Sequence, residues 1–152
     1  MIISEATEEA VCILAYISKE RETDAVTASE VSAATGILIG HTQDLLQKLA
    51  DVNILKTGAD RSAGFSLSGE SLERLTLLEV TKSIEGDPAN WHLPCPWQVT
   101  EESPRSLIAW QSLVLDISQL LANVKMSDII DWTISQGGLA FERQQMRQKK
   151  NL

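Results

Sequence analysis

The sequence is poor in the residue types on which several protein classes depend. Cys12 and Cys95 are its two cysteines, too few for a disulfide scaffold and in keeping with a reducing compartment. Its two histidines, His41 and His92, stand far apart, and no nucleophile, base and acid have the spacing typical of an enzyme. The apolar runs fall well short of the roughly 20 residues that a membrane span needs. We therefore expect a cytoplasmic, non-enzymatic protein with no membrane segment, no resident metal and no cofactor.

Positive charge is scarce as well. The chain has 13 lysines and arginines against 21 aspartates and glutamates, a formal net charge of −8. Residues 1–69 hold five basic and ten acidic side chains, and residues 70–152 hold eight and eleven. Basic side chains that neutralise phosphates supply most of the affinity of a general nucleic-acid binder, so this composition argues against one. The 43% hydrophobic and 22% charged residues are nevertheless typical of a folded globular chain.

Two helices are indicated in the first quarter of the chain. Apolar residues recur at helical spacing over residues 6–19. Thr27 and Glu30 have the spacing of a capping box, in which the first side chain accepts from the helix backbone and the second reaches back. The short helix that they open, over residues 28–35, ends at Gly36, because glycine readily adopts the left-handed conformation that closes a helix.

A second short helix and a hairpin follow. The helix covers about residues 40–51 and turns its leucines inward at helical spacing. Residues 54–57 and 65–67 are predicted as antiparallel strands, joined by a turn over residues 58–64. Two short helices joined through a glycine-containing turn form the helix-turn-helix pattern, and a hairpin directly after it is a wing. The alternative is an ordinary α+β domain that contains a hairpin.

The second half of the chain divides at a proline-rich stretch. Residues 75–84 form another amphipathic helix, stopped by Gly86, and all four prolines lie within residues 88–104. Proline removes backbone donors, so no long helix crosses this stretch. We predict a head of residues 1–86, a proline-rich loop of residues 87–105, dimerisation helices within residues 106–134, and a basic tail of residues 135–152.

Residues 107–121 are predicted as a helix that is apolar around most of its girth. Such a helix must be buried on several sides, and the small head cannot cover all of them. A second copy of the chain would supply the missing cover, so we expect a homodimer. The side chains expected in the dimer interface are Leu107, Trp110, Leu113, Val114, Ile117 and Leu121.

Several segments occur in the order and spacing of one known family. They are residues 31–36, 45–49, 54–56, 64–67, 75–86 and 126–130. Together they resemble the Rrf2 family of bacterial winged helix-turn-helix transcription regulators. The resemblance implies a mainly α fold with a small β-hairpin, built as a winged helix-turn-helix head plus a long dimerisation helix. It also implies a homodimer that binds a palindromic operator in double-stranded DNA and acts as a repressor.

The resemblance further implies which side chains meet DNA. Gln43 would bond an adenine in the major groove, and Thr42 would touch a thymine methyl or a phosphate. Relatives often carry an arginine in the wing at the position of Ala59, and here Arg61 would enter a minor groove instead. The alternative is that the helix residues are solvated polar side chains of a surface helix. The full set expected at the DNA is His41, Thr42, Gln43, Gln47 and Lys48 on the recognition helix, with Arg61 in the wing.

The acidic head leaves a second function open. Relatives often have basic residues near the N-terminus, where this chain has Ile2 and Glu5. The alternative function is therefore a dimeric protein-interaction module of the same fold that has lost DNA binding. If DNA binding is kept, either the operator affinity is modest or the tail supplies the missing charge through Arg143, Arg147, Lys149 and Lys150.

The loop that holds an iron–sulfur cluster in some relatives has few cysteines in this chain. Cluster-binding relatives place three cysteines in the loop before the dimerisation helix, whereas residues 87–106 hold Cys95 alone. An iron–sulfur cluster takes four ligands, and Cys95, His92 and Glu8 together fall one short. We therefore expect no cluster, and a small-molecule or protein effector instead. Cys95 is either a redox thiol or, with nothing basic nearby to lower its pKa, an ordinary loop residue. Trp91 and Trp97 either line a ligand pocket or pack this loop onto the core.

Overall fold

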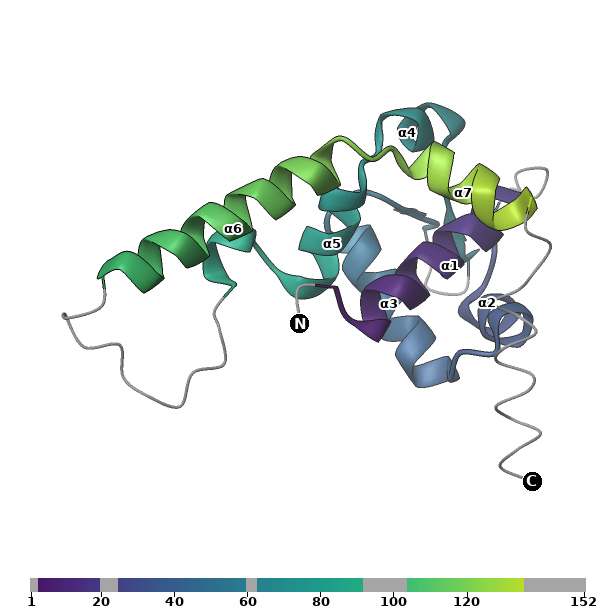
Figure 1. Ribbon diagram of the computed structural model, residues 1–152. Helices are drawn as coiled ribbons and strands as arrows, with labels where there is room; N and C mark the ends of the chain where they lie inside the picture. The colour runs from purple at the N-terminus through teal and green to yellow at the C-terminus, as the bar shows by residue number, and fades with distance from the viewer. Residues whose placement is uncertain (1–2, 20–24, 60–62, 92–103, 136–152) are drawn as a thin grey trace, which may run out of the picture.

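The computed structural model describes residues 3–19, 25–59, 63–91 and 104–135. Within these ranges the chain forms seven α-helices, a short 3₁₀ helix and a two-stranded antiparallel sheet (Figure 1). This confirms the predicted mainly α fold with a small β-hairpin. The elements are α1 (Glu5–Lys19), α2 (Ala28–Thr35), α3 (Ile39–Asp51), β1 (Lys56–Thr57), β2 (Phe65–Ser66), α4 (Gly69–Arg74), α5 (Leu77–Glu85), η2 (Pro88–Asn90), α6 (Pro104–Ala122) and α7 (Met126–Ser135).

The predicted capping box and glycine stop define α2. Thr27 Oγ1 accepts from the N–H of Glu30 at 3.3 Å, and Glu30 Oε2 accepts from the N–H of Thr27 at 2.7 Å. Gly36 lies at φ 76°, in the left-handed region, and turns the chain toward α3. Ser32 Oγ fixes this turn by donating to the carbonyl of Ile37 at 2.6 Å. The helices α2 and α3 pack together against α1, as the helix-turn-helix pattern predicts.

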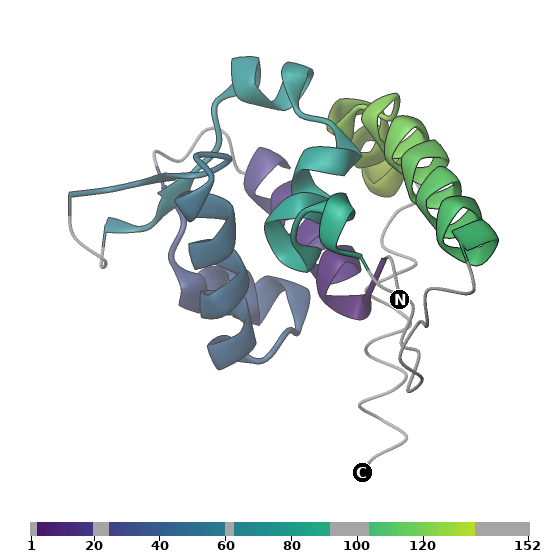
Figure 2. The same ribbon diagram turned by 90° about the vertical axis from the view of Figure 1, so that its left-hand side faces the viewer.

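The hairpin after α3 is shorter than predicted, with two paired residues in each strand. Ile54 and Leu55, expected in the first strand, instead donate their N–H groups to the carbonyl of Leu49 at 3.0 and 3.3 Å. Val26 extends the sheet beyond β2, since it exchanges two backbone hydrogen bonds with Phe65, at 2.9 and 2.8 Å. Figure 2 shows the hairpin projecting from the helices on the side away from α6.

The chain runs toward the head along α6 and joins it in α7, which packs against α1 and α4 (Figure 1). Met126 and Ile130 of α7 are buried in the core of the head. At this junction, the N–H of Met126 donates to the carbonyl of Leu75 at 2.8 Å, and the N–H of Leu77 donates to that of Val124 at 2.9 Å. The division at residues 86, 105 and 134 stays a prediction, but α7 shares the core of the head.

One apolar core lies between the helices of the head and takes residues from α1, α2, α3, α5 and α7. Among the helices of the described ranges, none combines the length and the apolarity needed to cross a bilayer. The side chains that are completely enclosed in this core include Ile13, Leu14, Val31, Leu45, Leu46, Leu49, Val80 and Met126.

Candidate nucleic-acid interface

The helix α3 is held in the head by one apolar face. Leu45, Leu46 and Leu49 are fully buried, and α3 packs against α1, α2 and α5. The spacing of these leucines follows the helical period, so the opposite face of α3 is polar and faces solvent. A helix set in this way can enter a major groove while its buried face stays in the core.

Thr42 does not lie on the exposed face, which corrects its predicted contact with DNA. Its side chain is fully buried, and Oγ1 lies 3.1 Å from the carbonyl of Leu38 and 3.3 Å from that of Ile37. Thr42 therefore stabilises the turn before α3, and its buried side chain is not available to contact a base. Its position three residues before Leu45 and four before Leu46 is the sequence signal for the buried face.

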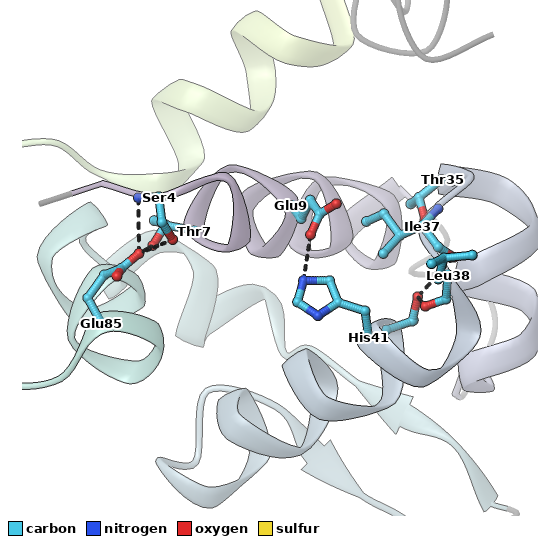
Figure 3. Close-up of polar contacts among 9 residues, drawn as sticks. Ser4, Thr7, Glu9, Thr35, Ile37, Leu38, His41 and Glu85 are labelled. Atoms are coloured by element: carbon cyan, nitrogen blue, oxygen red, sulfur yellow. Dashed lines mark hydrogen bonds and ion pairs between the residues drawn. The ribbon is translucent and has the colours of Figure 1, made fainter. Parts of the chain in front are cut away.

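His41 is exposed on α3 and is paired with a residue of α1. Its Nε2 lies 2.7 Å from Oε2 of Glu9 on α1, and both residues line a small surface pocket together with Ser4, Glu5 and Ala6 (Figure 3). The pair joins the first turn of α3 to α1. We therefore assign His41 a positioning role at the start of the recognition helix, which sequence reasoning could not find because Glu9 lies on another helix.

The remaining polar residues of α3 are exposed. Gln43 and Lys48 point their side chains to solvent, and Gln47 is exposed with its Nε2 donating to Oδ1 of Asp51 at 2.7 Å. Asp44 is exposed on the same helix, so the face carries both signs of charge. Arg61, the residues of the tail and Cys95 lie outside the described residues.

Two exposed apolar residues at the start of α3 were missed by the sequence reasoning. Leu38 is 82% exposed and Ile39 is 44% exposed. Their run with Ile37 in the sequence indicated only a connection between two helices. In the structure Ile37 is buried, whereas Leu38 and Ile39 turn outward.

A carboxylate joins the start of α1 to the end of α5. Glu85 Oε1 accepts from the N–H of Ser4 at 3.0 Å, from the hydroxyl of Ser4, and from Oγ1 of Thr7 at 2.6 Å (Figure 3). Partial burial by itself would raise the pKa of Glu85, but the hydrogen bonds from Ser4 and Thr7 outweigh it and lower that pKa. Glu85 thereby fixes α1, on which α3 rests.

The predicted dimer residues on α6 fall into two groups. Val114 and Leu121 are buried within the protomer, so the head itself covers them. Trp110 and Ile117 are half-buried, and the indole N–H of Trp110 donates to the carbonyl of Trp91 at 2.9 Å. Trp91 in turn donates its indole N–H to the carbonyl of Gly86 at 3.2 Å, which supports packing as its role.

Apolar side chains of α6 also stand uncovered on both flanks of its buried face. Leu113, one of the predicted dimer residues, is 47% exposed. The side chain of Leu107, another of them, lies outside the described part of the structure. Three further apolar residues are 58–67% exposed and were not in that set, although they belong to the same predicted helix. They are Ile108, Leu115 and Leu120.

A family model described as an iron-dependent transcriptional regulator, Rrf2, matches residues 3–132. The chain belongs to the Rrf2 family. It is therefore a transcription regulator of the winged-helix type, as the sequence resemblance predicted, and DNA is the partner of regulators of this family. No protein of curated function matches the sequence.

Solved structures share the Rrf2 fold of this chain at low sequence identity. CymR (YrzC), the global cysteine regulator of B. subtilis, has a TM-score of 0.66 at 14% identity, over 86% of this chain and 97% of that one. CymR of Staphylococcus aureus has a TM-score of 0.61 at 11% identity, over 84% and 96%. IscR of T. potens has a TM-score of 0.61 at 12% identity, over 85% of both chains.

Within the part of the chain that the structure describes, the donor atoms do not assemble a site for an iron–sulfur cluster. Cys12 is half-buried on α1, and burial, then Glu8 and Glu9, raise the pKa of its thiol, which disfavours the thiolate that binds iron. Cys95 is the other cysteine of the chain. The chain therefore has two thiols, whereas an iron–sulfur cluster is typically held by four cysteine thiolates. Across the described ranges, no three histidine, cysteine or acidic side chains lie close enough together to hold a metal ion.

Proposed function

We propose that the chain is a homodimeric repressor that binds a palindromic operator and works without an iron–sulfur cluster. The observation that carries this proposal is the setting of α3, whose buried leucines leave a polar face outward next to the hairpin. An exposed recognition helix followed by a wing is the arrangement that reads a major groove and its flanks. Repression acts at the operator, so we place the protein in the cytoplasm, with the bacterial chromosome.

The dimer is supported by the uncovered apolar side chains of α6. Ile108 and Leu115 stand seven residues apart, as do Leu113 and Leu120, so each pair lies along one side of the helix. Exposed apolar side chains that line up on one element mark an interaction site. Two copies that pair through α6 in an isologous contact would place two heads on two half-sites about one helical turn apart.

Base reading is assigned to the exposed polar residues of α3. Gln43 has the amide that can bond adenine in two places, and Lys48 is suited to a phosphate. Gln47 reaches the same face once its hydrogen bond to Asp51 opens. Arg61 in the wing and the basic residues of the tail would add the charge that α3 lacks.

The absence of a cluster is supported by the cysteine count and by the raised pKa of Cys12. The signal would then be a small molecule or a protein, or oxidation at Cys95. Anaerobic reconstitution with iron and sulfide should give no stoichiometric cluster absorption. A stable cluster that depends on Cys95 would contradict this part of the proposal.

Selection from random DNA duplexes at low salt tests the function. We expect enrichment of a palindromic sequence, and Gln43→Ala should then cost about 1–3 kcal/mol of binding and relax preference at one base. Lys48→Ala is the matched control, because a phosphate contact weakens all sequences alike. Enrichment of no sequence would leave the protein-interaction module as the function, which the exposed acids Asp44 and Asp51 favour.

A further inference from the structure

The turn before α3 exposes apolar surface at the tip of the recognition helix. Leu38 is 82% exposed, whereas Leu45, Leu46 and Leu49 of the same segment are fully buried. Burying a leucine side chain stabilises a fold, and the isolated protomer leaves this stabilisation unused at Leu38. Ile39, 44% exposed, continues the apolar surface into the first turn of α3.

Leu38 is also an unfavourable residue for the start of a helix. It occupies the N-cap position of α3, where its side chain makes no capping hydrogen bond. The helices α2, α4 and α5 start instead at Thr27, Ser68 and Thr76, each of which accepts from its own helix backbone. Serine, threonine, aspartate or asparagine would stabilise α3 better at this position. The fold of the protomer thus gains nothing visible from a leucine here.

The surroundings of this tip leave it apolar and open. Thr42 is buried, and His41 is paired with Glu9. At Gly40 an added Cβ would meet no atom within 4 Å, so the backbone of the first turn can be approached closely. The tip therefore consists of Leu38, Ile39 and Gly40, none of which carries a charge. Helix-turn-helix proteins bring the side chains at this place against base edges.

We propose that Leu38 and Ile39 contact thymine methyl groups in the major groove and set a preference for thymine at one position of each half-site. The thymine methyl is the apolar group that the major-groove edge of a base pair presents, and aliphatic side chains contact it. This inference rests on the proposed DNA binding, and it adds a readout that carries no charge to a recognition helix with few basic residues.

Deoxyuridine tests the contact directly, because it differs from thymidine by the methyl group alone. The wild-type protein is assayed on the selected operator with each thymine replaced in turn by uracil. One position in each half-site should show binding weakened about fourfold, the effect of losing one buried methyl group. Uracil at the other positions should leave the affinity unchanged.

Variants then assign the methyl contact to the tip. Leu38→Ala or Ile39→Ala should bind the thymine and uracil operators equally at that position. Val52→Ala is the matched control, because Val52 is 50% exposed at the far end of α3 and should retain the fourfold difference. Leu38→Ser controls for misfolding, because it introduces a hydroxyl that can cap α3 and should raise thermal stability. This variant should still bind the thymine and uracil operators equally.

The outcomes separate this inference from the function on which it rests. If no duplex is enriched in the selection, the DNA-binding function fails, and the inference fails with it. An enriched operator that tolerates uracil at every position overturns the thymine contact and leaves the function intact. Uracil sensitivity that persists in both tip variants also overturns it, and places the methyl contact on another residue.

Discussion

The helix α3 and the long helix α6 are both rich in apolar residues, but the protomer buries most of these residues in α3 alone. The inward leucines of α3 are fully buried, and its other face is polar along most of its length. By contrast, α6 buries Val114 and Leu121 against the head and exposes apolar side chains on both flanks of that buried face. The exposed residues are Ile108 and Leu115 on one flank and Leu113 and Leu120 on the other.

This difference separates a helix whose apolar residues pack within one chain from a helix that has apolar surface left for a second chain. A helix with one apolar face finds its place within a single chain, and its polar face remains for water or DNA. A helix that keeps exposed apolar side chains offers a surface to a second partner, for which we propose a second copy of the chain. The same substitution should therefore act on folding in α3 and on assembly in α6.

Leucine-to-alanine changes should give the largest contrast. Leu46→Ala removes a fully buried side chain of α3 and should lower the free energy of unfolding by about 2–5 kcal/mol. Leu120→Ala on α6 should change protomer stability by less than about 0.5 kcal/mol, because its side chain is 67% exposed. Urea unfolding at low protein concentration measures both. Equal losses in the two variants would show that α6 is buried within the protomer.

An acid on an exposed flank of α6 should separate assembly from folding. Leu115→Asp would bury an unpaired charge in the dimer, so we expect self-association to weaken at least about tenfold while the circular dichroism spectrum stays unchanged. Val52→Asp on α3 replaces an apolar residue of similar exposure and should leave self-association as it is. Sedimentation velocity over a range of concentrations reads both. Retained dimerisation in Leu115→Asp would place the dimer contact elsewhere.

A smaller effect is expected where α1, the support of α3, is tied to α5. Glu85→Gln should cost about 1 kcal/mol, because a neutral amide accepts more weakly from Ser4 and Thr7. The lowered pKa of Glu85 means that its contribution is complete above the ordinary pKa of about 4.5 and is lost as the pH falls through the lower folded value. Thermal melts of both proteins should therefore converge in acid. A difference that is constant down to low pH would exclude the ionised carboxylate as its cause.

The smallest effect concerns the thiol of Cys12 on α1. Burial, then Glu8 and Glu9, raise its pKa, so alkylation at pH 7 should be slow and should quicken above about pH 9. The rate should be the same in the wild type and in Leu115→Asp, because the head is closed without its partner. A Cys95→Ser background makes Cys12 the single thiol for mass spectrometry. Faster alkylation of the dissociated variant would show that the dimer also holds the head together.

Local sequence signals predicted most of the fold. The box of Thr27 and Glu30 and the stop at Gly36 located α2 to the residue, because capping depends on neighbours in the chain. The six-residue helix α4 was missed, since it is too short to show a helical period. The path of α7 back to the head was missed too, because it depends on bonds to Leu75 and Leu77 that no local pattern encodes.

The candidate site was predicted less well, for a related reason. Helical spacing identified α3, but the buried Thr42 was taken for a DNA contact because its residue type is polar. The pairing of His41 with Glu9 and the contacts of Glu85 with Ser4 join separate helices, which a single sequence does not align. The exposure of Leu38 also depends on how the turn before α3 is set, which the local sequence does not encode.

The attachment of α6 at its C-terminal end has a geometric consequence for operator spacing. At roughly 1.5 Å per residue, its 19 residues span about 28 Å. The carbonyl of Leu75 and the N–H of Leu77 form hydrogen bonds with the chain just after α6. A rotation of α6 would therefore rotate the head with it. In the proposed dimer the helices would cross near their middle, so a change of about 5° in the crossing angle would shift one head by about 1 Å relative to the other, against the roughly 3.4 Å between stacked base pairs. Any ligand or modification that alters the crossing angle of the proposed dimer would therefore change the half-site spacing that its two α3 helices fit.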